Sequence, residues 1–230
     1  MSSGVAIFVK TPAQSPVKTR LWPGLGQQLS VALYLICAEA VASVVAAAQQ
    51  HVDLQAYWAV AEAEALDGDA WVDLPHLPQG EGSLGQRMSQ VYRTLRMRHR
   101  GAILIGADTP QLIPAALERA ALWLASTESR LVMGRAEDGG FWLFGGNVDV
   151  SDDAWLVPRY STADTASEFI AALGPAGHWL QLETLRDIDT VEDLPGVHAD
   201  LSALSAPTAT QLRLLEWLDG IPIATLRTTA

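Results

Sequence analysis

Hydrophobic residues recur along the chain in two patterns that alternate with each other. Short β-branched or aliphatic runs at residues 5–10 and 102–105 are typical of strands, and the second run is apolar at every position, as in a central strand covered on both faces. The predicted strands are 5–10, 52–60, 102–105, 130–134, 141–144 and a short one near 179–182, and the predicted helices are 27–50, 83–100, 114–124, 162–173 and 208–218. This order predicts an α/β fold with a mostly parallel sheet and helices on both faces.

The most apolar segment, residues 30–48, is nearly long enough to cross a bilayer. It is mostly alanine and carries Glu39 near its middle, where a carboxylate costs several kcal/mol in lipid. We therefore predict no membrane span but a buried helix that is covered on more than one side, with Cys37 as a core thiol. The N-terminus has no basic region ahead of an apolar run, so no signal peptide is predicted and a cytoplasmic location is expected.

Composition and charge narrow the class of protein. The 230 residues are 49% hydrophobic and 18% charged, which excludes intrinsic disorder. The formal net charge of −11 argues against a nucleic-acid partner, because such proteins need a basic face. A single cysteine allows no internal disulfide and no cysteine-rich zinc site. No repeat, low-complexity stretch or glycine–serine linker divides the chain.

The loop after the first predicted strand carries an unusual charge distribution. The chain's two lysines, Lys10 and Lys18, both fall at this strand–loop junction, together with Arg20, and no acidic residue precedes Glu39. The loop lacks the G-x-G-x-x-G and G-x-x-x-x-G-K-[ST] patterns, which disfavours a dinucleotide site and a P-loop. Because ligands of such sheets bind at the carboxyl ends of the strands, we predict a phosphate-binding patch.

The alternative is a set of solvated surface charges on a mobile loop. If the patch instead binds phosphate, loss of Lys18 or Arg20 is expected to weaken phosphate-containing ligands and to leave the stability of the fold nearly unchanged, because exposed loop charges contribute little to folding.

Carboxylates follow the central strand and recur near the C-terminal third of the chain. Asp108 comes directly after the central strand, and Asp187 and Asp189 alternate in an extended segment, so that both fall on the same side. Hard cations such as Mg²⁺ prefer carboxylate oxygens together with substrate phosphates. Each site has an alternative role in capping, with Asp108 before a Thr-Pro turn and Asp189 or Thr190 before the next helix. Chemistry alone leaves both roles open.

Two glycine-rich stretches also admit two interpretations. Gly80, Gly82 and Gly85 leave the start of the following helix open, so that its free N–H groups are available to an anion or a base edge. The alternative there is a flexible loop with Ser83 as the N-cap. The Asp-Gly-Gly run at residues 138–140 is either a hairpin turn alone or a backbone wall beside a bound substrate.

Five motifs occur in one order over roughly residues 5–195. They lie at residues 8–12 continuing to 17–21, at 79–88, at 106–110, at 134–141 and at 187–194. On these motifs the chain resembles a bacterial family of small GT-A-type, glycosyltransferase-like nucleotide-diphospho-sugar transferases. That family was long catalogued as a domain of unknown function, and it is related to molybdenum-cofactor and phospholactate guanylyltransferases.

The resemblance implies a GT-A fold, that is, a Rossmann-like three-layer α/β/α domain over residues 1–204, with residues 205–230 as a helical extension of the same domain. Leu212, Leu215 and Leu218 share one face of the extension's helix, which either closes the core or forms a homodimer contact.

The resemblance also implies an enzyme. It would be a metal-dependent glycosyltransferase or nucleotidyltransferase that takes a nucleotide sugar or a nucleoside triphosphate and a small-molecule acceptor. The alternative is a non-catalytic nucleotide-binding or scaffold protein that retains the fold.

Residue roles follow from position in the motifs. The implied catalytic residues are Lys18, Arg20 and Asp108, and the implied metal, Mg²⁺ or Mn²⁺, is held by Asp108 and Asp189. The implied acceptor or sugar lies beside Asp138, Gly139 and Gly140. The residues implied for nucleotide and phosphate binding are Lys10, Thr11, Lys18, Thr19, Arg20, Gly82, Ser83, Gly85 and Arg87.

The chain departs from the family pattern at two places. Where the family has Pro-Gly-Arg, this chain has Gln14-Ser15-Pro16, which removes a glycine and a basic group from the phosphate loop. Phe141 stands where tyrosine is more frequent, which removes a hydroxyl. Both changes predict weaker contacts to a ligand.

Overall fold

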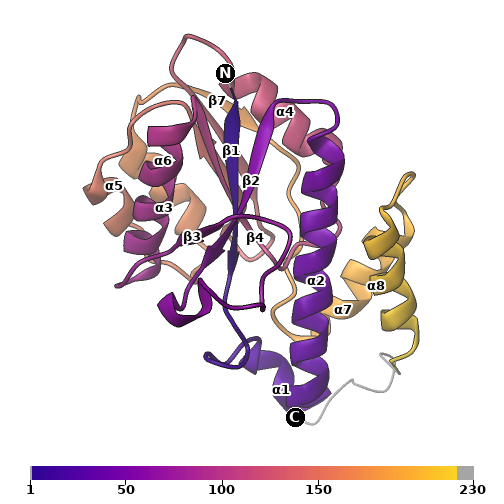
Figure 1. The fold of residues 1–230 in the computed structure, drawn as a ribbon. Helices are drawn as coiled ribbons and strands as arrows, with labels where there is room; N and C mark the ends of the chain where they lie inside the picture. The colour runs from indigo at the N-terminus through magenta and orange to yellow at the C-terminus, as the bar shows by residue number, and fades with distance from the viewer. Residues whose placement is uncertain (1, 222–230) are drawn as a thin grey trace.

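Among residues 2–221, which the computed structural model describes, seven strands form one sheet through the middle of the molecule (Figure 1). The strands are β1 (Ser3–Val9), β2 (Leu54–Val60), β3 (His76–Pro78), β4 (Gly101–Gly106), β5 (Arg130–Arg135), β6 (Phe141–Gly146) and β7 (His178–Gln181), in the order β3-β2-β1-β4-β6-β5-β7. Of these, only β6 runs antiparallel to its neighbours, β4 and β5. The predicted mostly parallel sheet is confirmed.

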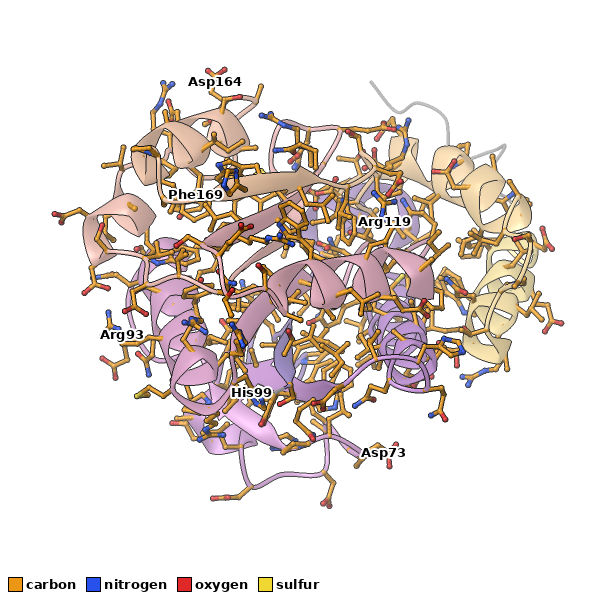
Figure 2. All side chains as sticks on the ribbon, turned by 90° about the horizontal axis from the view of Figure 1, so that it is seen from above. Asp73, Arg93, His99, Arg119, Asp164 and Phe169 are labelled. Carbon is orange, nitrogen blue, oxygen red and sulfur yellow. The ribbon has the colours of Figure 1, made fainter. Side chains whose placement is uncertain are left out.

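Helices cover both faces of this sheet (Figure 1). They are α1 (Trp22–Leu25), α2 (Gln27–Ala48), α3 (Leu84–Arg98), α4 (Pro114–Leu124), α5 (Asp152–Leu156), α6 (Thr165–Leu173), α7 (Leu194–Ser202) and α8 (Ala209–Asp219). Successive β1 side chains point to opposite faces, so Val5 and Ile7 pack with α2 and α4, whereas Ala6 packs with α3, α5 and α6. Phe169 of α6 is fully buried on that second face (Figure 2). The predicted three-layer arrangement is confirmed.

Helix α2 is buried on two sides, as the sequence predicts. Ala38 and Val41 pack against the sheet, whereas Leu33 and Cys37 pack against α7 and α8. Among the described residues, α2 is the one helix whose length and composition would allow it to cross a membrane. Half of its most apolar 18-residue window is buried inside the fold.

Helix α8 closes the core against α2 and α7, one of the two predicted roles, through a face that is rotated from the predicted one. Leu214 and Leu218 are fully buried, whereas Leu212 is 46% exposed and Leu215 is partly buried. Gln211 explains the rotation, because its Nε2 donates to two main-chain carbonyls in the loop before α4, at 2.7 and 2.9 Å. These bonds turn the helix so that Gln211, Leu214 and Leu218 face inward.

Two short elements, β3 and α5, are not predicted by the pattern of hydrophobic residues. Strand β3 has three residues, too few to show alternation, and α5 has five, less than two helical turns. The helix expected after Thr190 is divided into a 3-10 turn at Val191–Asp193 and α7. The part of the predicted C-terminal extension that follows residue 221 lies outside the described residues.

Candidate functional site

The loop after β1 carries Lys18 to the carboxyl ends of the central strands. Lys18 has φ 47° and ψ 42°, a left-handed conformation that residues other than glycine rarely adopt. Its side chain is 12% exposed, and Nζ donates to Asp108 Oδ2 at 2.8 Å and to Asp189 Oδ1 at 3.2 Å. Arg20 Nη1 donates to Asp189 Oδ2 at 3.0 Å and stays 69% exposed. Lys18 is therefore a buried counter-ion, and the surface-charge interpretation is wrong for it.

The protonation of Lys18 is set by two opposing effects. Burial of the ammonium lowers its pKa, but the charges of Asp108 and Asp189, together with the hydrogen bonds to them, raise the pKa further. The net pKa lies above the ordinary value for lysine. Lys18 is thus positively charged at any physiological pH.

Main-chain pairing holds the two acidic segments together. The N–H of Ile188 donates to the carbonyl of Asp108 at 3.0 Å, so residues 187–189 lie alongside the loop after β4. Carboxylate oxygens of Asp108, Asp187 and Asp189 all lie within 4.8 Å of one another. The structure thus brings together the two carboxylates implied as metal ligands and adds Asp187. Its spacing of two residues from Asp189 is the signal that the sequence offers for this third acid.

Neither Asp108 nor Asp189 caps a helix. Thr190 is the N-cap of the 3-10 turn, and Asp193 Oδ2 accepts the main-chain N–H groups of Asp189 and Thr190 at 3.0 and 2.7 Å. Helix α4 has Ile113 at its N-cap, without a side-chain cap. The capping role is therefore confirmed for Thr190 and wrong for Asp108 and Asp189, whose side chains face Lys18 instead.

A cavity of about 350 Å³ adjoins this cluster at the carboxyl edge of the sheet. Its charged lining comes from Lys10 and Arg20 as well as from Lys18, Asp108 and Asp189. Thr19, a predicted phosphate contact, also lines it. The structure therefore gathers six of the predicted site residues around one space.

The rest of the cavity lining is largely apolar. Phe8 and Pro16 contribute from the β1 end and its loop, and Leu84 contributes from the start of α3, where its side chain is 48% exposed. Tyr34 of α2 lines the space as well, and its hydroxyl accepts the N–H of Lys10 at 2.7 Å. Gln79, which follows β3, completes this wall. Apart from Pro16, which the sequence places in the phosphate loop, none of these residues is predicted from the sequence as part of the site, because each is of a type that is ordinary in a core or a loop.

The profile of a family described as "Uncharacterized protein conserved in bacteria (DUF2064)" matches residues 35–161, more than half of the chain. The chain belongs to the DUF2064 family. The match includes Asp108, whereas Lys18 and Asp189 lie outside it, so the association of these three residues rests on the structure. Among proteins with curated descriptions, none matches the chain in sequence.

Three solved structures with the same fold carry the names of transferases that act on nucleotides or nucleotide sugars. A protein from Desulfovibrio desulfuricans G20, named as a candidate nucleotide-diphospho-sugar transferase, has 24% identity and a TM-score of 0.82, over 98% of this chain and 99% of that one. A nucleotidyl transferase from Methanothermobacter thermautotrophicus has 14% identity and a TM-score of 0.57, over 88% and 99%. A cytidylyltransferase from Leptospira borgpetersenii has 13% identity and a TM-score of 0.51, over 100% and 99%. At these identities the likeness establishes the GT-A type of fold.

The three aspartates of this DUF2064 protein offer carboxylate oxygens, the ligands that a hard divalent cation prefers. Mg²⁺ and Mn²⁺ take oxygen ligands, and Mg²⁺ holds them at about 2.1 Å. One carboxylate oxygen from each of the three acids lies within 4.8 Å of the others, so the three acids are close enough together to share one ion. Lys18 bonds to two of the three acids and would have to yield some of these contacts.

Asp187 provides a test of the cluster's electrostatics in metal-free solution. Burial, followed by the charges of Asp108 and Asp138 and, less strongly, of Asp189, raises the pKa of Asp187 to about 7. The folded protein therefore binds a proton more tightly than the unfolded chain, in which an aspartate has a pKa of roughly 4. The contribution of Asp187 to the free energy of unfolding is thus fully present below pH 4 and is lost as the pH rises to 7.

Asp187→Asn is expected to abolish this loss, so that the stability difference between the variant and the wild type grows in favour of the variant as the pH rises from 4.5 to 7.5. Urea unfolding in the presence of a chelator at four pH values measures it. A difference that stays constant with pH would show that the carboxyl has an ordinary pKa.

Several predicted phosphate contacts of this DUF2064 chain lie outside the cavity lining. The N–H of Thr11 donates to Glu62 Oε2 at 2.8 Å and its hydroxyl accepts from Trp71 Nε1 at 3.1 Å, so both groups are already paired. Arg87 Nε donates back to the carbonyl of Gly82 at 3.1 Å. Gly85 lies under α5, where a Cβ would come within 2.2 Å of a main-chain carbonyl, which gives this glycine a packing role.

Ser83 forms a helix cap in this structure. It builds a capping box with Gln86, whose Oε1 accepts the Ser83 N–H at 2.8 Å while the Ser83 hydroxyl accepts from the Gln86 N–H. We expect Ser83→Ala to lower the free energy of unfolding by about 1 kcal/mol and the melting temperature by about 2–4 °C. Thermal unfolding and nucleotide titration of the same variant test this, with nucleotide affinity expected within about twofold of the wild type. A large loss of affinity at unchanged stability would instead place Ser83 on the ligand.

The Asp-Gly-Gly run forms the predicted hairpin turn between β5 and β6. Asp138 Oδ1 accepts the N–H of Gly140 at 2.7 Å, and Gly139 has φ 92°. A Cβ on Gly139 would meet the carbonyl oxygen of Ala163 at 2.0 Å, so the turn packs closely against the segment before α6. The three residues do not line the cavity, although the charge of Asp138 reaches Asp187.

Proposed function

We propose that this protein is a metal-dependent transferase that acts on a nucleotide-containing donor, by nucleotidyl transfer from a nucleoside triphosphate or glycosyl transfer from a nucleotide sugar. The observation that carries the proposal is the junction of three clustered carboxylates with Lys18 and Arg20 at the edge of a 350 Å³ cavity. The cavity lies at the carboxyl ends of parallel strands, where α/β sheets bind their ligands. The transferase names of the solved structures with this fold agree with it.

In this proposal the basic residues contact the phosphates of the donor, and the acidic residues hold the metal. Arg20 is largely exposed and is paired on one side alone, so its guanidinium is able to form a bidentate contact with a phosphate. Lys10, which is also exposed, lines the same cavity and would add a second cation for the phosphates of the donor. Asp108, Asp187 and Asp189 would hold Mg²⁺ or Mn²⁺, which neutralises phosphate oxygens and aligns them. Phosphoryl-type transfer needs this positioning and neutralisation more than covalent help from the protein.

Lys18 changes partners in this scheme. In the present arrangement its ammonium neutralises Asp108 and Asp189. If Asp108 and Asp189 held a divalent cation, the ammonium of Lys18 would be able to contact the phosphates of the donor at the same edge of the cavity. Lys18 would thus neutralise the carboxylates in the absence of metal and add positive charge beside the phosphates in its presence.

A panel of nucleoside triphosphates and nucleotide sugars, scored by melting temperature with and without Mg²⁺ or Mn²⁺, tests the proposal. A donor at 100 times its Kd is expected to stabilise the fold by about 2.7 kcal/mol, or roughly 5–10 °C, and only with the metal present. Release of pyrophosphate or of a nucleoside diphosphate in the presence of acceptors then separates nucleotidyl from glycosyl transfer. Metal-dependent binding without either product would favour the non-catalytic alternative, and no stabilisation by any donor would contradict both.

A further inference from the structure

Gln79 is anchored unusually firmly at the wall of the cavity. It lies just after β3 and is only 4% exposed. Its main-chain N–H donates to the carbonyl of Val60 at 2.9 Å, and its side-chain Nε2 donates to the carbonyls of Val9 at 3.0 Å and of Ala59 at 2.8 Å. The side chain thereby ties the ends of β1 and β2 together, and both its backbone and its tip are fixed.

These bonds determine which way the Gln79 amide points. A carbonyl oxygen accepts only from a donor, so the NH₂ group must face Val9 and Ala59, and Oε1 must point the other way. Within residues 2–221, no group donates to Oε1. The atom is not sealed inside the fold either, so it keeps some exposure, and Gln79 is one of the residues that line the cavity. Gln79 therefore presents one fixed, unpaired acceptor to whatever occupies this space.

Gln211 shows that a glutamine can donate to two main-chain carbonyls and still have its side-chain oxygen paired. It too is buried, at 2% exposed, and its Nε2 also donates to two main-chain carbonyls. Its Oε1, however, accepts the N–H of Thr208 at 2.9 Å, and the residue does not line the cavity. The two glutamines have the same structural role, but of the two only Gln79 lines the cavity and only Gln79 keeps an unused oxygen.

We infer that Oε1 of Gln79 accepts an N–H from the base of the bound nucleotide and so makes Gln79 a base-selecting residue of this site. The inference rests on the proposed function. Phe8 and Leu84 supply apolar wall beside Gln79, which suits a flat base. Gln79 covers the end of β2, which lies two strand spacings, about 10 Å, from β4, the strand that Asp108 follows. A nucleotide whose phosphates lie at the carboxylates would therefore place its base near Gln79. An unpaired acceptor in a buried wall penalises a ligand that offers it no donor.

Ligand analogues test this on the unaltered protein. Kd is measured by calorimetry with Mg²⁺ for GTP against ITP and 1-methyl-GTP, ATP against purine-riboside triphosphate, CTP against zebularine triphosphate, and UTP against N3-methyl-UTP. For the nucleotide that binds best, loss of the N–H that Oε1 accepts, by removal of an amino group or by methylation of a ring nitrogen, is expected to weaken binding about tenfold. The 2′-deoxy and 3′-deoxy forms of the same nucleotide are expected to bind within about threefold. Equal affinity for parents and analogues, or a loss confined to the deoxy sugars, would overturn the inference.

Two variants separate recognition from structure. Gln79→Met and Gln211→Met each remove a buried bridge between two carbonyls, so both are expected to lower the melting temperature. Only Gln79→Met is expected to reduce the parent-to-analogue ratio of Kd to about one, whereas Gln211→Met keeps the ratio of the wild type. If Gln79→Met fails to fold, the analogue series on the wild type still decides. Binding with an unchanged ratio in Gln79→Met overturns this inference alone, whereas no binding by the wild type overturns the proposed function as well.

Discussion

Lys18→Met is expected to lower the free energy of unfolding by about 3 kcal/mol in metal-free solution. The side chain keeps its length but loses the ammonium that bridges Asp108 and Asp189, so clustered carboxylates are left without an internal counter-ion. Breaking a buried ion pair costs about 3–5 kcal/mol, and the lower end applies because both carboxylates are about one-third exposed. Urea unfolding at pH 8 with a chelator measures the loss. Saturating Mn²⁺ should recover most of it, because the metal then replaces the missing positive charge.

Lys10→Met is the matched control for this substitution. Lys10 is the only other lysine in the chain, and its side chain is exposed, so its loss should change stability by less than about 0.5 kcal/mol. If Lys18→Met were as stable as Lys10→Met, the bridge would contribute nothing, as the sequence analysis expects for exposed loop charges. A loss that Mn²⁺ cannot recover would argue that Lys18, and not a metal, is the permanent cation of this cluster.

Asp108→Asn is expected to weaken metal-dependent nucleotide binding at least tenfold, or about 1.4 kcal/mol. The amide has nearly the same size and still accepts a hydrogen bond from Lys18, so the fold and the cavity should persist. It removes a negative charge from the group of acids placed to hold a divalent cation. Calorimetric titration of the best donor with and without Mg²⁺ measures the effect, and the metal-free affinity should change little.

The exposed Asp164 offers a control carboxylate for the titration. It lies at the outer edge of the molecule (Figure 2), and its side chain is 70% exposed. Asp164→Asn should bind the donor as the wild type does. Unchanged metal-dependent affinity in Asp108→Asn would mean that Asp108 serves the fold through its bond to Lys18 and takes no part in holding a metal.

Helices and strands could be predicted from the sequence where burial requires a long run of apolar residues. Residues 102–105 are apolar at every position, and they form the centre of β4, which is covered on both faces. Helix α2 shows the same effect, because its excess of apolar residues reflects packing on two sides. Helix α8 shows the limit of this reasoning. The inward position of Gln211 depends on two carbonyls about 100 residues away, which no local periodicity records.

The charged residues of the candidate site could be predicted from the sequence, but the contacts between them could not. Both lysines of the chain and Asp108 fall in loops at the carboxyl ends of strands, and this placement predicts their association. The burial of Lys18 depends on a left-handed backbone that lysine rarely adopts, so nothing in its sequence context indicates an internal counter-ion. Gln79 is similar, because its free oxygen becomes evident only when the partners of its amide nitrogen are known.

A crystal structure with Mn²⁺ and the best-binding donor, recorded at a wavelength where manganese scatters anomalously, tests the central claim most directly. The account predicts one anomalous peak about 2.2 Å from carboxylate oxygens of Asp108 and Asp189 and from donor phosphate oxygens. It also predicts that Lys18 Nζ has exchanged at least one of its two carboxylate contacts for a phosphate. A bound donor with no peak at this cluster, and with Lys18 still bridging Asp108 and Asp189, would contradict it.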